Sequence, residues 1–103
     1  MPSKKPVLML VKYMPKPGSE ERLLALVRQH WPTLRQLQLA TSTPAQLFRA
    51  VDKRTGRTAV VEMFEWTDDT SSETAHQLPE VMAVWEPMGP LLENMELTRL
   101  ERL

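Results

Sequence analysis

Apolar positions follow a strand-like pattern in several parts of the chain. Residues 7–13 are almost continuously apolar, which predicts a strand buried on both faces, and hence a central strand or one covered by a partner. Residues 45–51 and 57–66 also have strand composition, and residues 52–56 between them predict a hairpin turn. Gly56 occupies the turn position that requires a positive φ. These segments predict one buried strand followed by a hairpin.

A helical pattern separates the first strand from the hairpin. Glu20 and Glu21 follow the turn at residues 15–18, and acidic residues are favourable in the first turn of a helix. Apolar residues and one histidine then recur at helical spacing: Leu23, Leu26, Val27, His30, Leu34 and Leu37. Pro32 lies inside this pattern, which predicts a kink or a new short helix near Trp31.

Two further helical segments and a strand follow the hairpin. Thr70 and Glu73 have the spacing of a capping box, which predicts a short helix over residues 71–77. A second helix begins near Pro79, and its pattern is broken by Pro87 and Pro90. The last stretch alternates charged and apolar side chains from Met95 to Leu103 and reads as an edge or inter-subunit strand.

The order β-α-β-β-α-β predicts an α+β, ferredoxin-like fold with a four-stranded antiparallel sheet, in a single domain over residues 1–103. In the third strand, Val60, Glu62, Phe64 and Trp66 share one face, and Val61, Met63 and Glu65 share the other. Each face is apolar with one carboxylate, so both faces are expected to be covered. Helices can cover one face, and a second copy of the sheet is the simplest cover for the other. We therefore expect a homodimer through sheet-to-sheet packing.

Composition narrows the functional classes. The chain has 13 Lys and Arg and 13 Asp and Glu, and this zero net charge argues against nucleic-acid binding. It has no cysteine, which excludes disulfides and thiolate chemistry, and its two histidines make a poor metal site. No apolar run approaches the ~20 residues of a membrane span. A cytoplasmic protein without a membrane segment is the expectation.

Several segments together resemble a known superfamily. They are Val60–Trp66, Ala75-His76, Pro79–Val81 and Trp85–Leu91, within an element order that covers the whole chain. The chain resembles the dimeric α+β barrel proteins of the antibiotic biosynthesis monooxygenase superfamily. This resemblance implies a homodimer whose two sheets pack face to face, with the helices outside and the ligand between each sheet and its own helices.

The superfamily contains cofactor-free quinone-forming monooxygenases, haem-degrading oxygenases, lactone isomerases and proteins without a known role. Its haem-degrading branch uses an Asn on the first strand with a Trp and a His from the helices. Here the first strand has Tyr13 near that place, and the one Asn of the chain is Asn94. His76 falls near the Trp of that branch and Glu86 near its His. The triad is not intact, so haem degradation is not expected.

The candidate catalytic residues are His76 and Tyr13. His76 would bind a substrate oxygen or take a proton, or it would only cap its helix. Tyr13 would donate a hydrogen bond to the substrate, or its hydroxyl would lie in water at the strand end. Aromatic and sulfur-containing side chains would line an aromatic pocket, or would simply form core: Trp66, Trp85, Phe64 and Met88.

Two carboxylates and the other histidine complete the candidates. Glu62 and Glu65 lie in an apolar strand, where a buried carboxylate needs a partner or acts as an acid or base. A two-residue hairpin loop would place Arg49 opposite Glu62, whereas a longer loop would shift that register. We include Glu62 and Arg49 among the predicted substrate contacts. His30 is interpreted as a core or surface residue.

These observations favour a cofactor-independent monooxygenase that acts on a small planar aromatic or phenolic metabolite. No metal or organic cofactor is expected. The alternative is a non-catalytic, small-ligand-binding or stress-related homodimer whose interior is filled by core side chains. An open cavity beside His76 would favour the first hypothesis, and a filled interior would favour the second.

Overall fold

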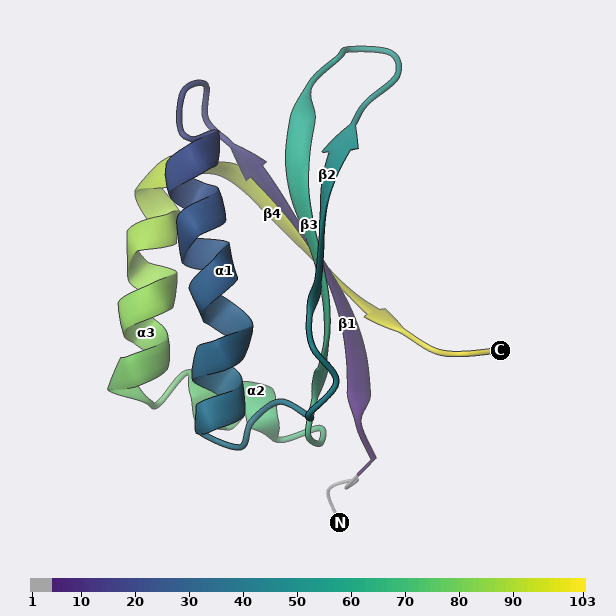
Figure 1. Ribbon diagram of the computed structural model, residues 1–103, viewed down its shortest axis with the longest axis vertical. Coiled ribbons are helices and arrows are strands. Elements are labelled where there is room, and N and C mark those ends of the chain that lie inside the picture. The colour runs from purple at the N-terminus through teal and green to yellow at the C-terminus, as the bar shows by residue number, and fades with distance from the viewer. Residues whose placement is uncertain (1–4) are drawn as a thin grey trace.

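The computed structural model describes residues 5–103; the first four residues of the predicted domain lie outside this range. The predicted element order is confirmed. The elements are β1 (Val7–Pro15), α1 (Glu20–Gln36), β2 (Gln46–Val51), β3 (Thr58–Trp66), α2 (Ser71–Ala75), α3 (Pro79–Trp85), the 3₁₀ helix η1 (Glu86–Leu91) and β4 (Leu92–Leu100). The strands form one antiparallel sheet in the order β2-β3-β1-β4. Figure 1 shows α1 and α3 side by side on the same face of this sheet.

The central position predicted for β1 is confirmed, because β1 pairs with both β3 and β4. β4 is an edge strand, as its alternating charges predicted, but it begins at Leu92 instead of Met95. The 3₁₀ helix ends at Leu91, so the chain enters the sheet directly from it. The proline breaks thus set the start of β4.

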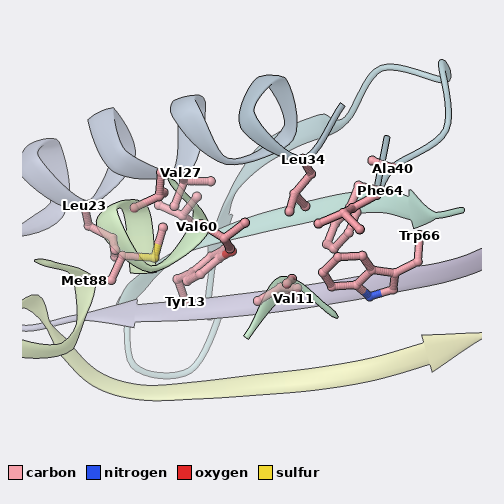
Figure 2. Close-up of a cluster of buried hydrophobic side chains, with 14 of the residues drawn as sticks. Val11, Tyr13, Leu23, Val27, Leu34, Ala40, Val60, Phe64, Trp66 and Met88 are labelled. Atoms are coloured by element: carbon pink, nitrogen blue, oxygen red, sulfur yellow. The ribbon is translucent and has the colours of Figure 1, made fainter. Parts of the chain in front are cut away.

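α1 is one helix through Pro32, so no second helix begins near Trp31. Proline removes only its own N–H bond to the carbonyl four residues earlier, and the packed face of the helix outweighs this local cost. That face is buried at Leu23, Val27, His30 and Leu34, in agreement with the predicted stripe. In Figure 2, Leu23, Val27 and Leu34 point from α1 toward the side chains of β1 and β3.

The capping box predicted for the short helix is wrong. Thr70 makes no side-chain cap to α2, which spans only Ser71–Ala75. Instead, Asp68 Oδ1 accepts hydrogen bonds from the Thr70 amide, the Thr70 hydroxyl and the Ser71 hydroxyl, at 2.9, 2.8 and 3.0 Å. These bonds, first that of the Thr70 hydroxyl, hold the pKa of Asp68 below its usual range. Asp68 therefore orders the turn that positions the following helices.

The second helical segment is divided where the prolines predicted a break. α3 starts at Pro79 and ends at Trp85, and the residues around Pro87 and Pro90 continue as the 3₁₀ helix η1. The tighter turn of a 3₁₀ helix is a common way to continue a chain that cannot keep α-helical hydrogen bonds. Val81, Val84, Met88 and Leu91 are buried against the rest of the core.

The two faces of the sheet are covered differently. The face that carries Val60, Glu62, Phe64 and Trp66 packs against the helices, and all four residues are buried. The helices leave the opposite face uncovered (Figure 1). Leu10 and Met63 are register partners on that face, and Phe48, which is 50% exposed, pairs with Val61 beside them. No helix among the described residues has the length and apolarity needed to cross a membrane.

Candidate functional site

Three polar side chains meet beneath α1 among the apolar residues of the core. The Tyr13 hydroxyl donates a hydrogen bond to Glu62 Oε1 at 2.7 Å. His30 Nδ1 lies 2.9 Å from Glu62 Oε1 and 3.1 Å from Oε2. The exposed fractions of Tyr13, His30 and Glu62 are 2%, 3% and 0%. A buried carboxylate is costly unless it is paired, and here both oxygens have partners.

The sequence brings these residues together through two periodicities. Strand alternation places Glu62 between Val60 and Phe64 on the helix-covered face of β3. On the neighbouring strand, Val11 is opposite Glu62, and Tyr13 lies one step further along the same face. His30 follows Val27 by three residues on the buried stripe of α1, so its ring points down onto the sheet.

The burial and charge of the cluster determine which groups donate its hydrogen bonds and which accept them. Burial raises the pKa of Tyr13 well above its usual range, and the charge of Glu62 and its hydrogen bond with the hydroxyl raise it further. The hydroxyl is therefore a proton donor, and Glu62 accepts. A carboxylate has no proton to give, so His30 Nδ1 is also a donor to it. The second ring nitrogen, Nε2, is buried and has no hydrogen-bond partner among residues 5–103.

An apolar cavity of about 280 Å³ lies beside this cluster, between the sheet and the helices. Its polar lining groups are Tyr13, His30, Ser72 and His76. The remaining lining residues are Met9, Val11, Phe64, Trp66, Trp85, Met88, Gly89, Leu92, Met95 and Leu97. Figure 2 shows Tyr13, Val11 and Trp66 along one side of the interior with Met88 at its end. The volume is close to the lower end of the range of about 300–1,000 Å³ that is common for small-molecule pockets.

Aromatic rings connect the two histidines across the cavity. His30 packs edge-on against Phe64 at 5.2 Å between ring centroids, and Phe64 packs against Trp66 at 4.9 Å. Trp85 contacts both imidazoles, at 5.8 Å from His30 and 4.7 Å from His76. His30 is buried, whereas His76 is exposed at the C-terminal end of α2. The inner end of the cavity thus has one imidazole and its mouth has the other.

The structure brings most of the predicted site residues together. Tyr13, Phe64, Trp66, His76, Trp85 and Met88 all line the cavity. Glu62 is not a lining residue and lies behind Tyr13 and His30. The hydroxyl of Tyr13 is directed to Glu62, so its predicted hydrogen bond to a substrate would compete with this contact.

Arg49 lies away from the cavity. It is opposite Val60, and Glu62 is opposite Leu47, because residues 52–57 form a loop longer than two residues. Arg49 is largely exposed and its Nε donates to Glu20 Oε1 at 2.6 Å. The Arg49–Glu62 pair, which required a two-residue loop, does not form, and the longer loop shifts the register as the second alternative predicted. Gly56 does have the predicted positive φ, at 74°.

His30 is the site residue that sequence reasoning missed. The signal was present, because His30 interrupts an apolar helical stripe and Glu62 interrupts an apolar strand face. Two polar interruptions on surfaces that must pack together point to one buried pair. Which strand α1 covers, however, is decided only by the tertiary arrangement. Among residues 5–103, no three His, Asp or Glu side chains are arranged to hold a metal ion.

Comparisons with known proteins support the fold. No family model and no curated protein sequence matches the chain. Among solved structures, a dimeric ferredoxin-like protein of unknown function from Jannaschia sp. has a TM-score of 0.73 and 14% identity, over 94% of this chain and 99% of that one. An antibiotic biosynthesis monooxygenase has a TM-score of 0.71 and 16% identity, over 94% and 98%. A mutant of SnoaB, a cofactor-independent oxygenase from Streptomyces nogalater, has a TM-score of 0.70 and 12% identity, over 95% and 93%.

These similarities confirm the predicted ferredoxin-like α+β fold. The resemblance to antibiotic biosynthesis monooxygenases is thus confirmed at the level of the fold. At these identities the comparisons say nothing of the reaction, which has to be argued from the cavity itself.

Proposed function

We propose that the protein is a cofactor-independent monooxygenase that oxidises a small, flat, neutral aromatic compound. The observation that carries this proposal is the apolar cavity, whose polar lining, within the part of the chain that the structure describes, includes two imidazoles and no charged Lys, Arg, Asp or Glu side chain. Such a lining favours an aromatic ring system with few polar groups. The fold similarity to SnoaB is consistent with this class of reaction.

The proposed reaction begins when an imidazole of the cavity removes a proton from an activated C–H or O–H group. The resulting anion donates electrons to O2, so the substrate is its own reductant. For a methylene between aromatic rings, one oxygen atom becomes the new carbonyl and the other leaves as water with the two hydrogens. The aromatic lining excludes bulk water, which strengthens the electrostatic control of the anion.

Dithranol, a dihydroxyanthrone with such a methylene, is a suitable probe. We expect the protein to accelerate O2 uptake and quinone formation from dithranol above the buffer rate. The His76→Ala variant tests the predicted role of the mouth residue, and Ala25→Ser on the exposed side of α1 is a matched control. Equal activity of the wild type and His76→Ala would remove His76 from the mechanism.

A binding measurement separates this function from its alternative. Trp66 and Trp85 line the cavity, so their fluorescence should be quenched when dithranol binds under anaerobic conditions. Quenching together with O2 uptake supports the monooxygenase. Quenching without any O2 uptake above buffer would contradict it and would favour a non-catalytic binding protein.

We also infer that the protein is a homodimer through the uncovered face of the sheet. Leu10, Met63 and Phe48 form an apolar surface there, and a second copy offers the same surface. The fold similarity to a dimeric ferredoxin-like protein supports this arrangement.

Introducing a charge at the centre of this surface tests the dimer. Leu10→Asp should shift the mass measured by light scattering from dimer to monomer at micromolar concentration, because the carboxylate would be buried without a partner. Ala25→Asp on exposed α1 should leave the mass unchanged. Circular dichroism checks that both variants are folded. A wild-type protein that is monomeric at these concentrations would refute the dimer.

A further inference from the structure

We propose that His30 is the catalytic residue that takes the proton of the substrate, and that Glu62 and Tyr13 are positioning residues for it. This proposal rests on the proposed function of the cavity and assigns its proton-transfer step. The cavity has two imidazoles, His30 and His76, and the two have very different surroundings. His30 is buried against Glu62, whereas His76 is exposed at the mouth.

The contacts of His30 select one tautomer. Nδ1 lies 2.9 and 3.1 Å from the two oxygens of Glu62, and a carboxylate can only accept. The Tyr13 hydroxyl donates a hydrogen bond to the same carboxylate at 2.7 Å and keeps its proton. The neutral ring therefore has its hydrogen on Nδ1 and its lone pair on Nε2. An imidazole held in this way is a proton acceptor with a defined direction.

Nε2 is the atom left free by this arrangement. It is buried and makes no hydrogen bond among the described residues, while the His30 ring lines the cavity. A buried polar atom without a partner is unfavourable, and such atoms are uncommon in folded proteins. A purely structural His30–Glu62 pair has no use for the free nitrogen. A substrate O–H or C–H group in the cavity would give Nε2 its missing partner.

The proton-transfer step balances with the groups present. The substrate bond to hydrogen breaks, its electron pair stays on the substrate, and a new N–H bond forms at Nε2. The imidazolium produced is next to the Glu62 carboxylate, which favours the charged ring. After O2 has reacted with the substrate anion, the same proton is returned from Nε2 to the oxygen that leaves as water.

The Trp85 ring packs against both imidazoles, the buried one and the exposed one. Water does not reach His30 Nε2 in the resting structure, so a side chain has to move when substrate enters. The Trp85 ring contacts both His30 and His76 and belongs to the last residue of α3, where the helix changes to η1. A shift of this ring would connect the exposed mouth to the buried nitrogen when substrate binds, whereas its resting position would keep water away from that nitrogen.

The tautomer can be measured without any substrate. The chain has two histidines, so long-range ¹H–¹⁵N spectra of histidine-labelled protein contain two ring systems, and the His76→Gln variant identifies that of His30. When the His30 ring is neutral, we expect hydrogen on Nδ1 and a bare Nε2. A hydrogen on Nε2 in the neutral ring would overturn the proposal, whatever the protein does with dithranol.

Kinetics then test the role of each residue. Positioned acid–base groups contribute about 10²–10⁴-fold to rates, so His30→Gln should lower kcat for dithranol by about 100-fold or more. His76→Gln should lower it by less. Glu65→Gln changes a residue on the opposite face of the sheet and should leave kcat unchanged. If His30→Gln retained wild-type kcat while folded, His30 would not be the proton acceptor.

The pH profile separates positioning from simple structural support. The titratable groups around the cavity are Tyr13 from β1, Glu62 from β3, His30 from α1 and His76 at the end of α2. Glu62→Gln removes the charge that favours the imidazolium, so the acid limb of kcat/KM should move to lower pH while kcat falls. Tyr13→Phe leaves the carboxylate to His30 alone, so that limb should move to higher pH. Limbs that stay fixed in both variants would overturn the positioning roles.

An anaerobic measurement keeps this proposal distinct from the proposed function. Without O2, we expect the protein to speed exchange of the dithranol methylene hydrogens with D2O, and His30→Gln should lose this effect. His30-dependent exchange under anaerobic conditions, together with no O2 uptake in the aerobic assay, would support His30 as the base and refute the monooxygenase. O2 uptake with exchange that does not depend on His30 would refute the role of His30 alone.

Discussion

Glu62 and Glu65 lie on the same strand and point to opposite faces of the sheet. Glu62 is fully buried beneath the helices, where Tyr13 and His30 satisfy both of its oxygens. Glu65 lies on the face without helices and accepts a hydrogen bond from the Thr41 hydroxyl at 3.0 Å. Its second oxygen is 3.5 Å from Nη1 of Arg102, a largely exposed side chain.

This difference shows how one residue type takes two roles on one strand. The partners of Glu65 come from exposed segments at the end of the sheet, and losing them leaves groups that water can reach. The partners of Glu62 come from β1 and α1 and are sealed from water, so each member of the cluster depends on the others. Of the two, only the Glu62 cluster has a free nitrogen beside a cavity. The helix-covered face is therefore where chemistry is expected, and the other face is where the sheet is expected to associate.

The largest expected effect comes from removing one partner of the buried cluster. Glu62→Leu leaves His30 and Tyr13 buried without their acceptor, and breaking such a pair costs about 3–5 kcal/mol of the free energy of unfolding. Urea denaturation at one fixed protein concentration measures this loss, since the proposed dimer would make stability depend on concentration.

Two comparison variants decide what the loss means. Glu65→Leu replaces a carboxylate on the apolar open face and should cost less than about 1 kcal/mol. The triple variant His30→Leu/Glu62→Leu/Tyr13→Phe replaces the whole cluster by apolar groups and should recover most of the loss. Similar costs for Glu62→Leu and Glu65→Leu would mean that the two faces do not differ as described.

Much of the fold could be predicted from local patterns. Alternation along β3 correctly assigned Val60, Glu62, Phe64 and Trp66 to one face, because strand side chains alternate whatever the rest of the chain does. The proline breaks after Trp85 were also predicted, since a missing N–H acts locally. These features depend on neighbours along the chain.

One of the features that were missed is local, and the others depend on partners distant in sequence. Thr70 has the spacing to Glu73 that is typical of a capping box. Its hydroxyl instead donates a hydrogen bond to Asp68, which organises the turn before α2. Pro32 remains inside α1 because the helix packs on the sheet. His30 contacts Glu62, which is 32 residues away in sequence, and the local sequence around either residue does not predict this pairing. Trp66 and Trp85 both lie in the stretch of chain from β3 to α3 and were easier to place in the site. The pair formed between α1 and β3 was harder to place.

Raising the pH tests the buried cluster of Tyr13 and Glu62. Its expected effect on the free energy of unfolding lies between those of the other two predictions. Because the pKa of Tyr13 is raised in the folded protein, its contribution to stability is complete below about pH 10, the usual pKa of the unfolded side chain. Above about pH 10 that contribution should be lost by up to about 1.4 kcal/mol per pH unit, since only the unfolded chain releases the proton. Urea denaturation of the wild type and Tyr13→Phe at several alkaline pH values measures the difference between them.

Tyr13 is the one tyrosine of the chain, so its ionisation can also be followed directly. The ultraviolet absorbance of tyrosinate should appear only together with unfolding. Tyrosinate absorbance in protein that remains folded near pH 10 would contradict the buried hydrogen bond to Glu62.

The smallest expected effect lies on the open face. Arg102→Ala removes an exposed side chain whose Nη1 is 3.5 Å from Glu65 Oε2, and such ion pairs contribute about 0–1 kcal/mol. The loss measured by urea denaturation should shrink further at high salt, because exposed charges are screened. If a second copy of the sheet covers this face, however, the pair is partly dehydrated in the dimer. The effect of Arg102→Ala should then be larger in the wild-type background than in Leu10→Asp, which is expected to be monomeric. Equal effects in the two backgrounds would place Glu65 and Arg102 outside the contact between the sheets.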